Sequence, residues 1–489
     1  RILMLSRSLG RVNYFPEDKE RELLELKKDW GFTDPRNTPE YKNCDICAND
    51  IFRDSWSQAG VQRTAFEPPP PMPQPHASNG ASTPADPSDP REALVQAITA
   101  EVLGFRDDRV LLMPLEEMRG IGPGCLVTAR QDRAAIPVGR GLLGRVVDGL
   151  GLPIDGKGPI ASDTEYPIYA EPLNPLKRSR IRTPLDIGVR AVNGLLTIGC
   201  GQRVGIFAGS GVGKSILLGM MARHTAADVN VIALIGERGR EVNEFIEKEL
   251  GEEGLKRSVI VVATSDHLPL IRLRGAYIAT AIAEYFRDRG NHVLLAMDSL
   301  TRFATAQRDV GFAAGEAPAA RGYPASVFSA LPKLLERAGC SENGSITAFY
   351  TVLTEGDDQN DPIADAARAI LDGHIVLSRR LADFGQYPAI DIEASVSRAM
   401  NEITDVAHQR AAREFKQLYS LYQQNQDLIS VGAYEVGSDD QIDLAIGAMP
   451  SLREFLHQDM HTRFGIKDSL DDLLTLFPQD QLPMSSANG

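Results

Sequence analysis

The sequence of 489 residues contains no run of eighteen or more apolar residues. A helix that crosses a membrane needs about twenty such residues in succession, so the sequence predicts no membrane-spanning helix. Cysteine is scarce too, with five residues, an odd number that indicates a reducing compartment and not a disulfide framework. Cys44 and Cys47 have CxxC spacing, but no second pair and no nearby His completes a zinc set. We interpret them as free thiols.

Basic residues are in the minority. The chain has 66 Asp and Glu residues against 52 Lys and Arg residues, which gives a net charge of −14. Nucleic-acid binding depends on clustered Lys and Arg that contact phosphates, so this balance argues against a nucleic acid as partner. Hydrophobic residues make up 43% of the chain, as in ordinary globular proteins. The length exceeds one ordinary core, and we expect two or three domains.

Changes in composition divide the chain. Prolines crowd among Ser, Ala, Gly and Asp at residues 67–90, which predicts a disordered linker. Before it, the readable feature is a charged, helix-like stretch at residues 16–29. After it, short apolar runs with frequent turns predict a small β-barrel, with strands near residues 97–104, 109–113, 125–129 and 144–147. The predicted parts are an unassigned segment (1–66), the linker (67–90), a β-barrel-like domain (91–160), an α/β domain (161–400), a helical domain (401–477) and a tail (478–489).

The central region alternates between apolar segments of strand length and amphipathic segments of helix length. This pattern predicts an α/β fold with a mainly parallel sheet that is covered by helices on both faces. The expected strands are residues 202–207, 229–235, 258–263, 292–297, 345–353 and 374–377, and the clearest helices are 271–287 and 327–338. A long helical segment at residues 403–426, followed by shorter ones, predicts an all-α C-terminal domain.

The most specific motif is AGSGVGKS at residues 208–215, between an apolar strand and a helix-like segment. In such a loop glycines let the backbone N–H groups face phosphate oxygens, the lysine reaches the β- and γ-phosphates, and the serine hydroxyl contacts magnesium. The strict P-loop pattern begins with Gly, whereas Ala208 stands here, and a small side chain is sufficient at a position that forms the turn. The predicted ATP-binding residues are Gly209, Ser210, Gly211, Val212, Gly213, Lys214 and Ser215.

Two acids follow apolar strands. Asp298 ends a strand segment at the place where a P-loop fold carries its magnesium ligand, so we predict Mg²⁺ bound with ATP through Ser215 and Asp298. Glu237 follows another strand, and at the carboxyl edge of a parallel sheet its carboxylate can orient and polarise the attacking water. We therefore predict that Lys214 and Glu237 are catalytic. We also predict a catalytic role for Arg238, which could hold Glu237 or a phosphate, with a surface arginine that begins a helix as the alternative.

Residues 100–464 resemble the flagellar type III export ATPases, relatives of the catalytic subunit of the rotary ATP synthase. Besides the phosphate loop, the motifs that carry the resemblance are GERGRE (236–241), DSLTR (298–302), RGYP (321–324) and residues 344–365 with TEGDD (354–358). The resemblance implies a hexameric ATPase with nucleotide sites between subunits, located in the cytoplasm and peripheral to the inner membrane. The implied partners are ATP, further copies of the chain, export substrates and chaperones, and export-apparatus proteins at the membrane.

The resemblance also implies roles for three further residues. Arg398, in SVSR (395–398), would be contributed to the γ-phosphate in a neighbouring subunit, although the residues alone allow an ordinary salt bridge. Tyr387 would stack on adenine, with a buried core tyrosine as the alternative, and Tyr434 would lie near the same base. Residues 1–90 do not resemble the start of this family, which predicts a barrel that is incomplete or differently closed.

Several related functions share this machinery. Glu237 argues against the non-catalytic rotary subunits, which lack the water-orienting glutamate. Virulence secretion ATPases and the catalytic rotary subunit remain alternatives, and the form of residues 208–215 and 239–242 favours the flagellar group. A Rho-like RNA translocase would need a basic, aromatic RNA-binding domain, which neither the barrel segment nor the charge of −14 supplies. A scaffold protein would bind nucleotide without turnover.

Overall fold

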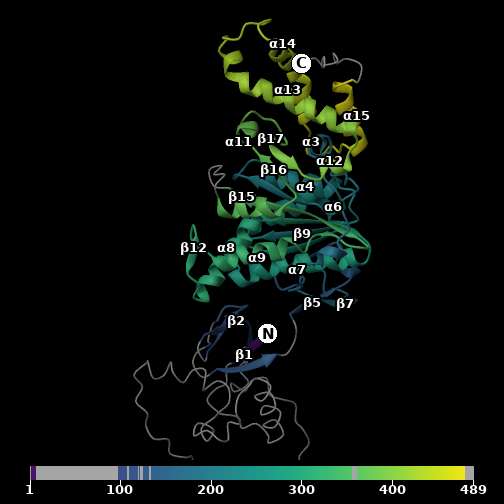
Figure 1. Cartoon of the computed structure of the whole chain (residues 1–489). Coiled ribbons are helices and arrows are strands. Elements are labelled where there is room, and N and C mark those ends of the chain that lie inside the picture. The colour runs from purple at the N-terminus through teal and green to yellow at the C-terminus, as the bar shows by residue number, and fades with distance from the viewer. Residues whose placement is uncertain are drawn as a thin grey trace, which may run out of the picture. The chain divides into compact units, whose positions relative to one another are not determined.

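The computed structural model describes residues 2–6, 97–106, 109–118, 121, 125–130, 134–354 and 361–478. The chain divides into two compact units, Arg1–Arg133 and Ala134–Gly489, which are described separately below (Figure 1). The predicted linker, the helix-like stretch at residues 16–29, the pair Cys44 and Cys47, and residues 479–489 of the predicted tail all lie outside the described residues.

The first unit contains a four-stranded antiparallel sheet in the order β3-β2-β1-β4. Its strands are β1 (Ile2–Ser6), β2 (Ala97–Arg106), β3 (Arg109–Pro114) and β4 (Leu126–Arg130). Ile98 and Ala100 of β2 are fully buried and form the centre of its small core. Strand β1 lies between β2 and β4, and its Leu3 pairs with both Ala100 and Ala129. This strand was not predicted, because a five-residue segment gives no sign of partner strands about a hundred positions away in the sequence.

The second unit is built on a nine-stranded, mainly parallel sheet in the order β17-β16-β8-β15-β11-β9-β10-β6, with β14 paired to β15. All pairs are parallel except those of β17 and β14. The strands are β6 (Arg145–Asp148), β8 (Arg203–Ala208), β9 (Val229–Ile235), β10 (Ser258–Ala263), β11 (His292–Asp298), β14 (Gly339–Cys340), β15 (Ser345–Leu353), β16 (Gly373–Leu377) and β17 (Ile390–Ser397). All six predicted strands are therefore present, and the prediction of an α/β core is confirmed.

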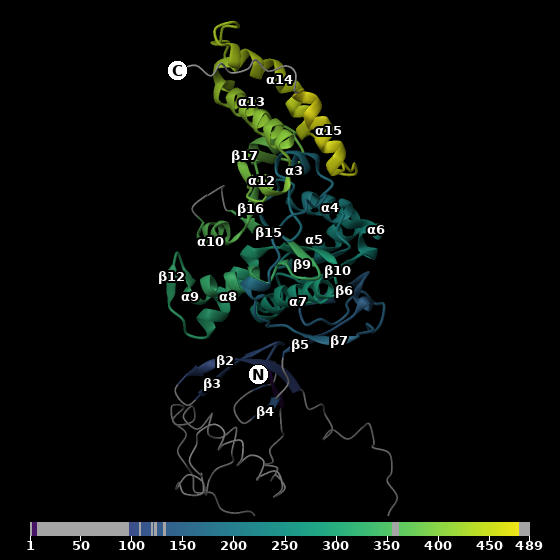
Figure 2. The same ribbon diagram turned by 45° about the vertical axis from the view of Figure 1, so that its right-hand side comes forward.

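Helices cover both faces of this sheet, with α4 and α6 on one side and α7, α8 and α9 on the other (Figure 1, Figure 2). Seven residues of β9 and six of β10 are all buried, as expected for strands that are covered on both faces. The helices are α3 (Arg190–Leu195), α4 (Lys214–His224), α5 (Gly239–Glu244), the π-helix η5 (Phe245–Leu250), α6 (Gly251–Lys256), α7 (Pro269–Asp288), α8 (Leu300–Ala313), α9 (Ala325–Leu335), α10 (Pro362–Ile370) and α11 (Arg379–Asp383).

Smaller elements border the sheet. The ribbons β5 (Ala135–Val138) with β7 (Thr164–Pro167) and β12 (Pro318–Ala320) with β13 (Tyr323–Pro324) are antiparallel, and η3 (Arg140–Leu142) and η4 (Pro175–Lys177) are single 3-10 turns.

Strand β6 differs from its predicted place. The segment at residues 144–147 was expected in the β-barrel-like domain at residues 91–160, but β6 instead pairs in parallel with β10 at the edge of the large sheet. The division into compact units accordingly falls after Arg133 and not after residue 160. A short apolar strand has the same pattern in either sheet, so the partner, which the local sequence does not specify, decides its position.

The C-terminal region is all-α, as predicted, with α12 (Met400–Ile403), α13 (Val406–Ser430), α14 (Asp440–Leu456) and α15 (Ile466–Leu476). The expected single helix at residues 403–426 is two helices, because the Asp405 side chain accepts the backbone N–H of His408 and caps a new start. Phe415 and Phe455 pack with the nucleotide-domain residue Leu195 in one continuous core. The helices are therefore attached to the sheet domain by a shared apolar interior.

Candidate active site

The phosphate loop joins the end of β8, at Ala208, to the start of α4, at Lys214. Gly211 and Gly213 have positive φ values of 80° and 93°, a backbone conformation that residues other than glycine rarely adopt. Val212 between them is 1% exposed and anchors the loop in the core. The loop thus leads into the N-terminus of an eleven-residue helix, where unpaired N–H groups and the helix dipole favour an anion.

Three predicted residues meet behind this loop. The Nζ atom of Lys214 lies 2.7 Å from Oδ1 of Asp298 and 3.6 Å from Oε1 of Glu237. The three side chains are 12%, 4% and 17% exposed. They come from β8–α4, β11 and β9, and the register places Asp298 beside Leu234, three residues before Glu237. The parallel sheet therefore brings together at its carboxyl edge three groups that are far apart in the sequence.

Burial and charge set the ionisation of this cluster. Burial opposes the charged lysine, but Asp298 and Glu237 outweigh it and raise the pKa of Lys214. Burial, followed by the neighbouring charge of Asp298, raises the pKa of Glu237 to about 8, although Lys214 acts in the opposite direction. Protonated Glu237 donates a hydrogen bond to Glu241, which lowers the pKa of Glu241. Glu237 is thus a partly buried carboxyl group that changes its charge near neutral pH, as expected of a general base.

Asp298 is held by a residue that the sequence did not single out. The Thr351 hydroxyl, on the adjacent strand β15, donates to Oδ1 of Asp298 at 2.7 Å, and Thr351 is fully buried. Strand β15 also carries the hydroxyl side chains of Ser345, Thr347 and Tyr350, so its sequence gives no signal that singles out Thr351. Ser215, in the first turn of α4, is exposed. A carboxylate and a hydroxyl are oxygen donors of the kind that Mg²⁺ prefers, so the residues present fit that ion.

Arg238 does not contact the cluster in its described bonds. It precedes α5, its side chain is 80% exposed, and its Nη1 lies 3.5 Å from Oε1 of Glu241. The structure therefore places Arg238 at the surface start of a helix, the alternative that the sequence left open.

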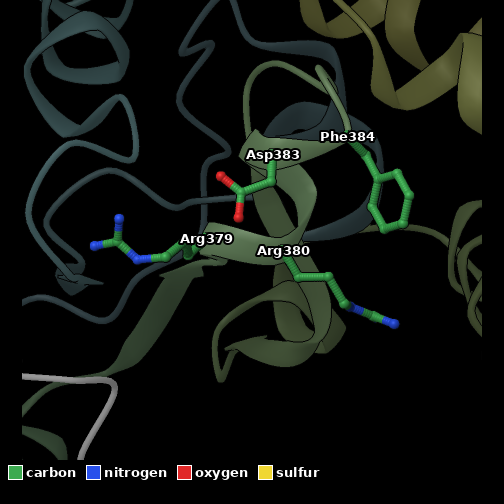
Figure 3. Close-up of a pocket in the computed structure, with 4 residues that line it drawn as sticks. All are labelled: Arg379, Arg380, Asp383 and Phe384. Carbon is green, nitrogen blue, oxygen red and sulfur yellow. The ribbon is translucent and has the colours of Figure 1, made fainter.

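The segment after β16 borders the phosphate loop. Arg379, in α11, donates from Nη2 to the carbonyl of Ser210 at 2.7 Å, a contact that the sequence did not suggest. Arg379 and Arg380 extend in opposite directions from α11 and line a pocket with Asp383 and Phe384 (Figure 3). Just beyond it, Tyr387 is 42% exposed, and its ring would lie 3.7 Å from a Cβ added to Gly213. Tyr387 is thus beside the loop and is not a buried core residue.

Arg398 lies at the amino edge of the parallel strands, the edge opposite to the phosphate loop. Strand β17 runs antiparallel to β16, with Ser397 opposite Gly373, and the backbone N–H of Arg398 donates to Asp372 next to the start of β8. The phosphate loop follows the other end of β8. A six-residue strand such as β8 spans roughly 17 Å between its first and last Cα atoms. The exposed Arg398 therefore stands at the amino edge, away from the nucleotide loop of its own chain.

Tyr434 lies between α13 and α14. Its hydroxyl donates to the carbonyl of Asp439 at 3.0 Å and to Oδ1 of Asp443 at 2.9 Å. These bonds belong to the C-terminal helices. The described contacts do not connect Tyr434 with Tyr387 or with the phosphate loop, so its place near the base stays a prediction.

Comparison with known proteins agrees with this geometry. Residues 188–397 match the nucleotide-binding domain of the ATP synthase alpha/beta family, residues 95–130 match the beta-barrel domain of the same family, and residues 404–475 match the T3SS EscN ATPase C-terminal domain.

Relatives with named functions match most of the chain. The flagellum-specific ATP synthase of Pseudomonas aeruginosa is 57% identical over 386 residues, covering 78% of this chain and 86% of the relative. The type 3 secretion system ATPase of Xanthomonas euvesicatoria is 54% identical over 381 residues, with 78% and 86% covered. The structure of the assembled ATPase EscN from the enteropathogenic E. coli type III secretion system has a TM-score of 0.75 at 49% identity, covering 78% of this chain and 92% of that one. The chain accordingly belongs to the family of flagellum-specific ATP synthases and type III secretion ATPases, and it is an ATP-hydrolysing enzyme.

Proposed function

We propose that this chain hydrolyses magnesium ATP as part of a hexamer and that hydrolysis energises the export of flagellar proteins through a type III secretion apparatus. The observation that carries the proposal is the cluster of Lys214, Asp298 and Glu237 behind a glycine-rich loop at the carboxyl edge of a parallel sheet. Relatives of both the flagellar and the secretion type, with 50% identity or more, support the biological role.

Each residue of the cluster has a distinct task. The loop from Gly209 to Gly213 presents N–H groups to the phosphates, and Lys214 leaves its carboxylate partners to pair with the β- and γ-phosphates. Magnesium, held by Ser215 and Asp298, would neutralise charge on the phosphate oxygens when ATP is bound. Glu237, once ionised, accepts a hydrogen bond from the attacking water and orients it toward the γ-phosphorus. Tyr387 offers its exposed ring to the adenine.

We assign Arg398 to the active site of a neighbouring copy. Its position at the amino edge, one strand length from its own phosphate loop, supports this assignment, since an arginine acts on the γ-phosphate only at contact distance. Phosphoryl transfer leaves negative charge on the γ-oxygens, and an arginine supplied there contributes about three to five decades in rate. The proposal makes catalysis dependent on assembly.

The first experiment tests the cluster. Phosphate release and ATP binding are measured for the wild-type chain and for Glu237→Gln and Arg238→Gln. Loss of the carboxylate should lower turnover by about two to four decades while ATP binding survives, because a general base contributes about that much. Arg238→Gln is the matched surface control and should remain within about twofold, as expected for an exposed side chain. Unchanged turnover in Glu237→Gln would refute the assignment of the base.

The second experiment tests the shared site. Lys214→Ala chains and Arg398→Ala chains are inactive in separate preparations under this proposal. Mixing them creates some interfaces in which both Lys214 and Arg398 are intact, so part of the turnover should return. Assembly is confirmed by sedimentation in each mixture. Complete failure of assembled mixtures to regain turnover would place the arginine elsewhere.

The partners beyond ATP follow from the family. We propose export substrates with their chaperones and membrane-bound export-apparatus proteins as partners, and a cytoplasmic location at the inner membrane. Among the described helices, none has the length and apolar character needed to cross a membrane. Introducing the gene into flagellar and virulence secretion mutants separates the two roles: restored motility supports the flagellar proposal, and rescue of virulence secretion alone would overturn it.

A further inference from the structure

Gln202, the residue before β8, is fully buried and has hydrogen bonds from both ends of its side-chain amide. Its Oε1 accepts the backbone N–H of Gly199 at 2.9 Å. Its Nε2 donates to the carbonyl of Asp372 at 3.0 Å and to the hydroxyl of Ser397 at 3.1 Å. One side chain thus connects three segments that are separated by up to 195 positions in the sequence.

Two of these three partners of Gln202, Ser397 and Asp372, also adjoin Arg398. Ser397 precedes it in the chain, and the Ser397 hydroxyl also donates to the carbonyl of Thr197 at 2.7 Å. The backbone N–H of Arg398 donates to the carbonyl of Asp372 at 3.0 Å, the same oxygen that Gln202 contacts. The Ser397–Arg398 peptide is therefore linked to the Gln202 amide in two ways, through the Ser397 hydroxyl and through the Asp372 carbonyl that both N–H groups share.

The guanidinium of Arg398 is held less firmly than its backbone by contacts within its own chain. It is exposed, and its Nη2 donates to the carbonyl of Arg368 at a long 3.3 Å. Its direction toward solvent is consequently set by the backbone that carries it. Support for that backbone comes from Gln202 and from Asp372, whose carboxylate receives Nε and Nη2 of Arg203 at 2.9 and 3.0 Å.

Gln202 also lies directly before β8, the strand that leads into the phosphate loop. Arg203 starts β8, and the carbonyl of Gln202 accepts the backbone N–H of Ala348 in β15. Six residues after Gln202, β8 ends at Ala208 and the phosphate loop begins. The Gln202 amide therefore fixes the Arg398 backbone to the strand that carries the phosphate loop of the same chain.

We propose that Gln202 is a positioning residue for Arg398: its amide holds the 397–398 backbone in the place from which the arginine reaches the nucleotide of a neighbouring copy. This inference rests on the proposed function, because it takes Arg398 as the arginine that contacts the γ-phosphate. Gln202 does not contact ATP in this account, so its loss affects the rate of the chemical step and leaves nucleotide affinity unchanged.

The test uses Gln202→Met, which keeps the length of the side chain and removes its amide. Steady-state phosphate release and ATP affinity are measured on the full assembled chain. We expect kcat to fall about a hundredfold, as for a misplacement of about 1 Å at a reacting centre, with the Kd for ATP within about twofold of wild type. Ser397→Ala removes the hydroxyl from the same network and should lower kcat in the same direction.

The decisive measurement is a double-mutant cycle with Arg398→Ala. If Gln202 acts through Arg398, then Gln202→Met should change the slow turnover of the Arg398→Ala chain by less than about twofold, because the group it positions is gone. This slow turnover can be measured as the release of radiolabelled phosphate from ATP that is labelled at its γ-phosphate. Asn230→Leu is the control: Asn230 is equally buried and donates to Ala222 and Ser258 in another part of the sheet. It should destabilise the protein without this dependence on Arg398.

The possible outcomes distinguish failure of the positioning role of Gln202 from failure of the proposed function of Arg398. An equal fall in kcat with and without Arg398, or an unchanged kcat in Gln202→Met, overturns the positioning role while the proposed function stands. Normal turnover in Arg398→Ala overturns the assignment of the arginine and this inference with it. If Gln202→Met fails to assemble, the same cycle with Ser397→Ala decides, because this variant removes the bond from the Gln202 amide to Ser397 and keeps the bonds to Gly199 and Asp372 that support the fold.

Discussion

The surroundings of Glu237 give turnover a pH dependence that can be worked out in advance. Its pKa is raised from 4.5 to about 8, first by burial and then by the charge of Asp298. Only the ionised carboxylate can accept a hydrogen bond from water. With a pKa of about 8, roughly a tenth of the free enzyme is ionised at pH 7, so kcat/KM should rise about tenfold between pH 7 and a plateau above pH 9.

Two variants check the cause of this rise. Glu237→Gln removes the titrating group, so its residual turnover should lose the dependence. Glu241 raises the pKa of Glu237, both as hydrogen-bond acceptor and as a neighbouring charge. Glu241→Gln should therefore move the midpoint of the pH profile to lower pH and increase kcat/KM at pH 7. The charges of Asp298 and Lys214, which also face Glu237, are unchanged in this variant.

Stability gives a second measurement with a defined sign. Because the folded-state pKa of Glu237 lies above its value of 4.5 in the unfolded chain, the folded state binds more protons between these values. The free energy of unfolding should fall as pH rises from about 4.5 to about 8. Denaturation curves of Glu237→Gln should show a smaller fall. A kcat/KM that is flat from pH 6 to 9, together with identical unfolding profiles for both proteins, would refute this account of Glu237.

Three further predictions concern single contacts. Thr351→Val removes the hydrogen bond to Asp298 and should lower kcat about tenfold in steady-state assays, as the loss of about 1.5 kcal/mol for a bond to a charged group implies. Arg337→Met leaves Glu284 buried without its bidentate partner and should cost about 3–5 kcal/mol in chemical denaturation, which a second change, Glu284→Leu, largely restores. Tyr387→Ala should weaken ATP binding in a calorimetric titration by about 1–3 kcal/mol, whereas Tyr387→Phe keeps the ring and the affinity.

The parts of the fold that the sequence predicted are those with local signals. The phosphate loop combines a buried strand, glycines with positive φ and a helix start within a dozen residues, and each signal is visible without knowledge of the partners. Asp298 and Glu237 were predicted because residues that follow parallel strands share one sheet edge. Strands β1 and β6 were missed or misplaced because their partners, β2 and β10, lie about a hundred residues away.

The parts of the site that the sequence did not predict depend on contacts across the sheet. Thr351 and Asp298 are separated by 53 positions, and Arg379 and Ser210 by 169. Thr351 lies in the segment 344–365 that carries the family resemblance, but that segment assigned it no role, and Arg379 lies in none of the motifs. Only the order of strands brings each of the two residues to its partner. The place of Arg398 at the opposite edge likewise follows from the direction of β17, which a sequence pattern does not reveal.

The charges of the site explain why its residues can remain together without a nucleotide. Lys214 neutralises Asp298 at 2.7 Å, and Glu237, with a pKa of about 8, is mostly protonated at neutral pH. A triphosphate that attracts Lys214 removes the counter-charge from the Asp298 carboxylate, whose side chain is 4% exposed, and this is costly unless another cation replaces it. Nucleotide that arrives with a divalent cation supplies that charge at once. The buried position of Asp298 therefore favours the magnesium complex of ATP over free ATP, through the same Lys214 bond that stabilises the ligand-free site.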